Sequence, residues 1–325
     1  MFTPQISRYA NLYFFIQNLS EWHFSNRKKH NETWRKELHF SKEAESTIQE
    51  FKKIHEQYSF GDKYLGRPFF IYKNPWPAIE ILTGKNNTVK IKRIFATLEP
   101  YFDTFYKKDE TMLKKWATII TKPKFTASAS YINNMLACFY GCAPYNDHCI
   151  IYLLLSTEKK NGGTSRTISD HAVTLELSRT PIKSEKLMLN ILWHELIHLY
   201  FRNFMLYPLL EKYTKNNQTT MKKIDELIAS SLLPNGLLKK HKLIIPNRHA
   251  TSDNFNSRIS SNKIICVQEL IYPYLQQKKT IDAKLVQELL KNNKAVAKNS
   301  PPLTLELAGM ILARVDSKRQ KRNRI

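Results

Sequence analysis

The sequence predicts an α+β fold with a small sheet near the middle of the chain and mainly helical regions before and after it. Two short segments, 148–155 and 171–179, have the apolar patterns of strands, and a long apolar helix pattern follows them at about 185–207. Apolar residues at helical spacing dominate the rest of the chain. Hydrophobic residues make up 42% of the 325 residues, which suffices for one large core or two smaller ones.

Changes in pattern divide the chain into four predicted parts. They are a mainly helical N-terminal region, 1–122; a core with the two strands, 123–240; a helical C-terminal region, 241–315; and a disordered basic tail, 316–325. The first boundary lies at residues 122–124, where a proline between two lysines follows the helical pattern. The tail is predicted from the concentration of Lys and Arg at 318–324.

The first region contains a helix with a clear start. Ser41 is a suitable N-cap, and Glu43 and Glu45 follow where the helix dipole favours acidic side chains. One face is then predicted to be buried by residues at helical spacing: Ala44, Ile48, Phe51, His55 and Tyr58.

The rest of the first region alternates between turn and helix patterns. A turn-rich stretch, 61–77, contains a short β-like run at 69–72. Helices are predicted at 91–105 and at 109–121. The second of these places one group of side chains on the core side: Met112, Trp116, Ile119 and Ile120.

The core region contains the two strand patterns. Segment 148–155 is a continuous apolar run, which is typical of a buried strand. A glycine pair at 162–163 predicts a loop before segment 171–179. In that segment apolar residues alternate with polar or small ones, so we expect one face on the core and the other toward solvent or a ligand. The apolar face consists of Val173, Leu175 and Leu177.

The predicted helix at 185–207, which ends before Pro208, carries His194, Glu195 and His198 in an HExxH motif. Two histidines four residues apart lie on one face of a helix, so both rings can bind one ion at about 2.0–2.1 Å. Glu195 then lies beside the ion and can accept a proton from attacking water. From 191 to 201 Glu195 is the only charged residue, and burying these polar groups costs free energy unless they have partners. A chance motif with both histidines hydrogen-bonded in the core is the simpler alternative.

The strand followed by this helix resembles the zincin metallopeptidases over about 149–233. The resemblance implies a zincin-like core whose mixed sheet ends in an edge strand that binds substrate backbone, followed by the active-site helix. It implies that His194 and His198 bind one Zn²⁺ and that Glu195 is the general base for peptide-bond hydrolysis. The residues that it places on the substrate-binding edge strand are Val173, Leu175 and Leu177.

The third ligand decides the subgroup of the resemblance. Metzincins have Gly and His where this chain has Phe201 and Phe204. Proteases of the Spartan type have a His soon after the motif, whereas the next His after His198 is His241. The gluzincin arrangement remains, in which a Glu on a second helix completes the site.

Glu226, 28 residues beyond His198, is the candidate for that third ligand. It lies in a predicted helix, 221–233, whose core face is formed by Ile224, Leu227 and Ile228 and whose Ala229 and Ser230 allow a close approach to another helix. Asp225 and Glu211 are rival ligands, and Glu226 as a solvated helix residue is the plain alternative. Thermolysin-like enzymes have a shorter spacing and an Asp where this chain has Ser230.

Other candidate residues follow from the same hypothesis. A peptidase needs an oxyanion stabiliser, and the downstream candidates are His241, His249, Tyr272 and Tyr274, with His249 and Tyr272 preferred. The spacing of Cys138, Cys142, His148 and Cys149 is not a common zinc pattern and favours buried free thiols. Further helices are expected at 263–277, 282–293 and 304–317.

The composition leaves a second functional hypothesis open. The formal net charge of +23 attracts nucleic acid or acidic proteins, so the rival is a basic binding protein with a non-catalytic HExxH helix. A metal-bound but catalytically silent scaffold is a third possibility. No apolar run reaches the 18 or so residues that span a bilayer, and the N-terminus lacks a signal-peptide pattern. We therefore expect a cytoplasmic peptidase acting on peptides or proteins, with signal-independent export left open.

Overall fold

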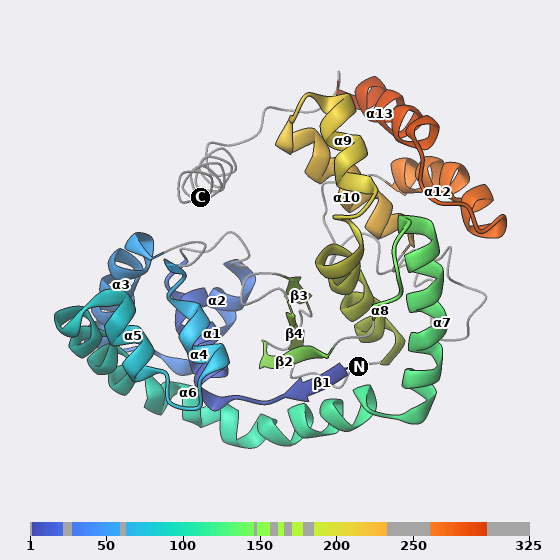
Figure 1. Cartoon of the computed structure of the whole chain (residues 1–325). Helices are drawn as coiled ribbons and strands as arrows, with labels where there is room; N and C mark the ends of the chain where they lie inside the picture. Colours follow the sequence, from blue (N-terminus) through green and yellow to red (C-terminus); the bar gives the residue numbers. More distant parts are fainter. Residues whose placement is uncertain are drawn as a thin grey trace.

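The computed structural model describes residues 2–21, 28–58, 63–145, 148–156, 162–165, 171–177, 185–232 and 261–297. A small sheet lies at the centre and helices surround it, so the predicted α+β class is right (Figure 1). Among the described residues, no helix combines the length and the apolar character needed to cross a lipid bilayer. His241, His249, the helix expected at 304–317 and the basic tail lie outside the described residues.

The sheet has four strands in the order β1-β2-β4-β3. Strand β2 (Cys149–Leu155) pairs in parallel with β1 (Phe2–Gln5) on one side and with β4 (Ala172–Leu177) on the other. Strand β3 (Gly162–Ser165) pairs antiparallel with β4 at the edge. The two predicted strands therefore exist and are neighbours, whereas the glycine pair that predicted a loop begins β3.

The prediction that Val173, Leu175 and Leu177 form an edge strand is wrong. Their strand, β4, pairs with β2 and with β3, so its backbone groups on both sides are used within the sheet. Its second face is not open either, because Thr174 and Glu176 are only 4% and 3% exposed. The alternating pattern defined two faces of the strand, but it carried no information about which strands lie beside it.

The N-terminal region contributes to the same sheet, so the sheet is not confined to 123–240. Phe2 is the register partner of Cys149, at the start of β2. Helix α1 (Arg8–Leu19) then continues along β2, and Asn11 Nδ2 donates to Leu153 O at 3.0 Å. Asn11 Oδ1 accepts from Leu155 N at 2.7 Å. This side chain supplies hydrogen bonds to β2 beyond the last residue that β1 pairs with.

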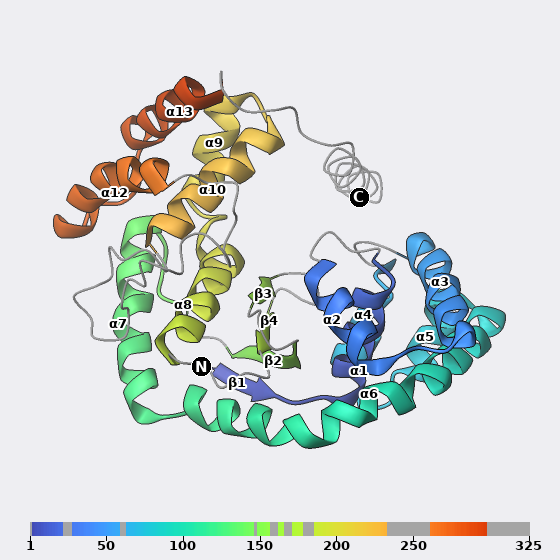
Figure 2. The ribbon, with the colours of Figure 1, turned by 180° about the vertical axis from the view of Figure 1, so that it is seen from behind.

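The helices of the first region gather at one end of the molecule, and the last and longest of them runs from there past the sheet toward the other end (Figure 2). They are α1, α2 (Lys28–Leu38), α3 (Lys42–Gln57), α4 (Gly66–Ile71), α5 (Trp76–Thr83) and α6 (Lys85–Ile120). Ser41 caps α3 as predicted, accepting from Ala44 N at 3.1 Å. The β-like run at 69–72 lies mostly in α4, so that prediction is wrong. The two helices predicted at 91–105 and 109–121 are parts of the single helix α6, which continues through Pro100.

The helices of the other end begin with α7, which follows α6 around the sheet (Figures 1 and 2). They are α7 (Pro123–Tyr140), α8 (Glu185–Leu196), the π-helix η2 (Ile197–Phe201), α9 (Leu206–Thr214), α10 (Gln218–Leu232), α12 (Ser261–Gln276) and α13 (Ala283–Ala297). The helix expected at 185–207 is therefore interrupted after η2. Pro208 lies in the first turn of α9, where its missing N–H leaves no hydrogen bond unmade.

Candidate metal centre

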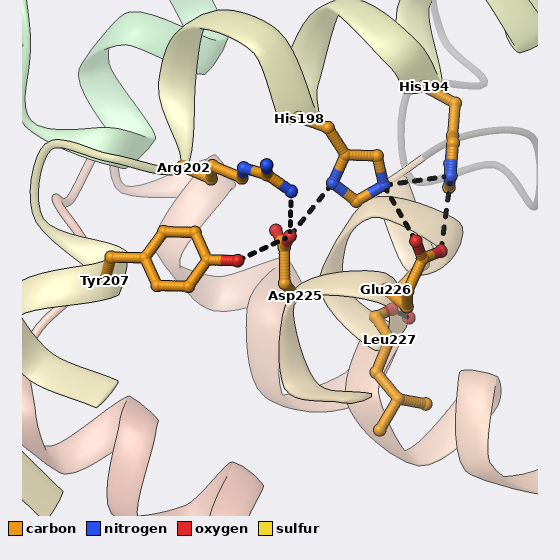
Figure 3. A network of polar contacts seen from close by, with 8 residues as sticks. His194, His198, Arg202, Tyr207, Asp225, Glu226 and Leu227 are labelled. Atoms are coloured by element: carbon orange, nitrogen blue, oxygen red, sulfur yellow. Dashed lines mark hydrogen bonds and ion pairs between the residues drawn. The ribbon is translucent and has the colours of Figure 1, made fainter. Parts of the chain in front are cut away.

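Two helical segments carry the candidate ligands: the continuous segment formed by α8 and η2, and helix α10. Helix α8 supplies His194, the π turn η2 supplies His198, and the neighbouring helix α10 supplies Glu226 (Figure 3). Helix α10 packs on the core through its predicted apolar face, because Ile224, Leu227 and Ile228 are all buried. The HExxH motif thus crosses a change in helix type. The backbone bond from Arg202 N to Ile197 O, at 3.4 Å, has the i+5 spacing of a π turn, a feature that is frequent at functional sites.

The three side chains converge on one small volume. His194 Nε2 lies 3.1 Å from His198 Nε2. Glu226 Oε2 lies 3.5 Å from His194 Nε2, and Glu226 Oε1 lies 3.3 Å from His198 Nε2. One potential ligand atom from each residue lies within 4.8 Å of the others.

These separations fit a metal ion. Ligands at 2.0–2.1 Å from zinc in a tetrahedral site are separated by about 3.3 Å from one another. The two histidine nitrogens are 3.1 Å apart, and each lies 3.3 or 3.5 Å from one of the two oxygens of the Glu226 carboxylate, which is close to that value. Two imidazoles and one carboxylate are also a ligand set that zinc uses in catalytic sites, where a fourth position stays open. His194, His198 and Glu226 can therefore hold a divalent cation.

The electrostatics of the cluster favour positive charge. Both histidines are nearly buried, with 3% and 4% of their surface exposed. Burial alone would lower the pKa of His198, but the charges of Asp225 and Glu226 outweigh it and hold the pKa well above its ordinary value. Burial alone would raise the pKa of Glu226, but His198 and the hydrogen bond with His194 hold it well below its ordinary value. The Glu226 carboxylate is thus ionised, and the negative charges of Asp225 and Glu226 around His198 favour a bound cation.

Asp225 contacts the opposite edge of the His198 ring, at Nδ1. Its Oδ2 lies 3.0 Å from His198 Nδ1, 2.9 Å from Arg202 Nη1 and 3.5 Å from the Tyr207 hydroxyl (Figure 3). Burial alone would raise the pKa of Asp225, but the charges of His198 and Arg202 lower it. Asp225 is therefore a hydrogen-bond partner of the candidate ligand His198. In the sequence analysis it was a rival of Glu226 as the third ligand.

Arg202 and Tyr207 were not predicted from the sequence. Arg202 lies four residues after His198, as His198 lies four after His194, so all three share one helical face. This spacing was a signal that could have been read. Tyr207 gave no such signal, because the turn after η2 brings it to Asp225.

The remaining candidates lie in different places. Glu195 is half-buried on α8, directly after His194. Glu211 is exposed on α9. Tyr272 lies on α12, where its hydroxyl accepts from Gln276 Nε2 at 2.7 Å, and Tyr274 donates to Asp282 at 2.7 Å. The structure therefore does not bring Tyr272 or Tyr274 to the histidine cluster.

The cysteines do not form a second candidate site within the described residues. All four are free thiols. Cys149 is buried in β2 as expected, whereas Cys138 is exposed and its thiol contacts the Lys278 carbonyl oxygen at 3.3 Å. The metal-ligand cluster among the described residues is the one formed by His194, His198 and Glu226.

Comparison of the chain with models of protein families, with curated proteins and with solved structures finds no match.

Proposed function

We propose that the chain is a zinc-dependent peptidase with a zincin-like core of the gluzincin type. The observation that carries the proposal is the convergence of two imidazole nitrogens and a carboxylate at separations of 3.1 to 3.5 Å, from two different helices. A chance HExxH motif has no reason to meet a carboxylate 28 residues away at metal-ligand spacing. His194, His198 and Glu226 are the proposed ligands.

The residues of the chain have distinct proposed roles. A bound zinc ion would supply Lewis-acid chemistry, polarising the scissile carbonyl and making water a better nucleophile. With the ion bound, His194 and His198 would present unprotonated nitrogens to it, and Glu226 would supply one negative charge. Glu195 accepts the proton of the attacking water and passes it to the leaving amine. Its place next to His194 and its half-buried side chain suit that task.

The substrate-binding strand is reassigned in this proposal. Strand β4 cannot bind a peptide by backbone pairing, because it is paired on both sides. Among the described strands, β1 and β3 (Gly162–Ser165) have a neighbour on one side only, and β3 is the edge strand next to β4. Helix α8 contacts both β3 and β4. We therefore assign the binding of an extended peptide to the β3 edge.

The proposal is tested by comparing the wild type with Glu195→Gln on a library of peptides, with new termini detected by mass spectrometry. The wild type is expected to cleave in a zinc-dependent way. Glu195→Gln is expected to retain zinc and lose more than about 100-fold in rate, because the proton acceptor is gone. Glu211→Gln, which changes an exposed glutamate, is the matched control. Full activity of Glu195→Gln would refute the role of this residue.

The rival hypothesis of a basic binding protein rests on the net charge of +23. It predicts a folded protein that binds nucleic acid, with an affinity that falls steeply as salt rises. It also predicts no stoichiometric metal. The peptidase hypothesis predicts the opposite result for the metal, so metal content separates the two.

A further inference from the structure

The carboxylate of Asp225 is arranged unusually for a group that pairs with an arginine. Three donors converge on a single oxygen, Oδ2: His198 Nδ1, Arg202 Nη1 and the Tyr207 hydroxyl. The second oxygen, Oδ1, is buried and has no hydrogen-bond partner among the described residues, and the same is true of Arg202 Nε. A bidentate arginine–carboxylate pair would use Oδ1 as well as Oδ2, and in its side-on form it would also use Nε.

This arrangement is not the one that stabilises the ion pair best. A buried acceptor without a partner costs free energy, because it has lost water and gained no hydrogen bond. The side chains of Asp225 and Arg202 are only 2% and 14% exposed, and the desolvation of such buried pairs offsets much of their attraction. The orientation of Asp225 instead favours its hydrogen bond with His198, at 3.0 Å.

That hydrogen bond determines the state of the His198 ring. In a neutral ring, Nδ1–H that donates to Asp225 leaves the other nitrogen, Nε2, to present its lone pair. His198 Nε2 faces His194 Nε2 at 3.1 Å and Glu226 Oε1 at 3.3 Å. Asp225 and Glu226 therefore hold the two nitrogens of one imidazole from opposite sides (Figure 3).

We propose that Asp225 and Arg202 are positioning residues for His198. Asp225 fixes the orientation of the ring through the hydrogen bond to Nδ1, and Arg202 holds the Asp225 carboxylate in the position that this requires. The inference rests on the metal site of the proposed function. It adds that metal affinity depends on two residues that do not touch the ion.

The experiment measures zinc affinity by competition with a chromogenic chelator. Asp225→Asn keeps the shape of the side chain but removes its charge, and it is expected to weaken zinc binding by about 10- to 100-fold. Asp103→Asn is the matched control, because Asp103 forms an ion pair with Arg8 at 2.6 Å on α6, away from the cluster. It is expected to leave zinc affinity unchanged.

Arg202 provides a second, independent readout. Arg202→Gln is expected to weaken zinc binding, whereas Arg202→Lys is expected to restore most of the affinity, because a single charged donor makes the observed contact. The double variant Arg202→Gln/Asp225→Asn is expected to lose no more than Asp225→Asn alone, since Arg202 acts through Asp225. The visible absorption spectrum of the cobalt-loaded protein should change in Asp225→Asn and stay unchanged in Asp103→Asn.

Several results would overturn the inference. Wild-type affinity in folded Asp225→Asn would do so, and so would fully additive losses in the double variant. If Asp225→Asn does not fold, equal affinities of Arg202→Gln and Arg202→Lys would refute the proposal. A wild type that binds zinc but cleaves no peptide would remove the proposed activity and leave the positioning role intact. A wild type that binds no divalent metal would remove both.

Discussion

Asp225 and Glu226 are neighbours in the sequence, yet they contact different nitrogens of the same imidazole. Successive residues on a helix point about 100° apart, so two adjacent carboxylates can reach around one ring that lies across their helix. One of them sits on the side where His194 also lies, and the other sits on the side of Arg202. In the proposed site, Glu226 would bind the cation and Asp225 would orient its ligand His198.

A prediction at this scale concerns Glu226. Glu226→Gln removes the negative charge that the cluster offers to a cation but keeps the length of the side chain. Zinc affinity is expected to fall by more than about 100-fold, beyond the 10- to 100-fold typical of residues that act behind the ligands. Competition titration with a chelator measures the loss. Glu211→Gln on the exposed face of α9 serves as the control, and equal zinc affinities of the two variants would show that Glu226 is not a ligand.

At the scale of elements, Asn11 links helix α1 to the central strand β2. Strand β1 pairs with β2 only as far as Tyr152, and Asn11 then bonds Leu153 O and Leu155 N at 3.0 and 2.7 Å. The side chain is only 1% exposed, so water cannot readily replace it. Asn11 thus acts in place of further strand residues along this side of β2.

The corresponding prediction is a loss of stability in Asn11→Ala. Two buried backbone groups of β2 lose their partners on this side, and the free energy of unfolding is expected to fall by about 2–4 kcal/mol. Urea denaturation followed by circular dichroism measures the change. Asn87→Ala is a suitable control, because the half-buried Asn87 makes longer bonds, at 3.2 and 3.3 Å, to groups outside the sheet. Equal losses in the two variants would contradict the role assigned to Asn11.

The elements that could be predicted from the sequence are those with local causes. The Ser41 cap, the apolar face of α10 and the strands β2 and β4 each follow from residues close together in the chain. The strand β1 could not be predicted, because four residues that include Pro4 become a strand only by pairing with β2, far along the chain. The run at 69–72 was misread because aromatic and β-branched residues favour strands, whereas packing of Phe69 and Phe70 against the core favours helix α4.

The residues of the candidate site also divide into those that a local pattern predicts and those that depend on long-range packing. His194, Glu195 and His198 are specified by one helical turn, so the motif alone predicted them. Glu226 followed from the resemblance and from the pattern of its helix. The contact of Asp225 with His198 depends on how α10 lies against η2, which no local pattern fixes. The order of the strands depends on the same kind of long-range packing, and for that reason the edge strand was assigned to the wrong segment.

At the scale of the whole molecule, one continuous core joins the N-terminal helices, the sheet and the helices of the candidate site. The histidine cluster lies toward one end of this arrangement, between α8 and α10, while α1 to α5 pack at the other end and α6 runs past the sheet between the two ends (Figures 1 and 2). The net charge of +23 belongs to the chain as a whole and does not identify a binding face. The proposed function therefore rests on the cluster rather than on the overall charge.

The metal content of the purified protein tests this account most directly. Protein prepared without chelators, supplied with zinc and freed of excess ion, is expected to contain about one zinc ion per chain by elemental analysis. His194→Ala, with its fold verified by circular dichroism, is expected to contain almost none. A folded wild-type protein that retains no stoichiometric divalent metal would contradict the account.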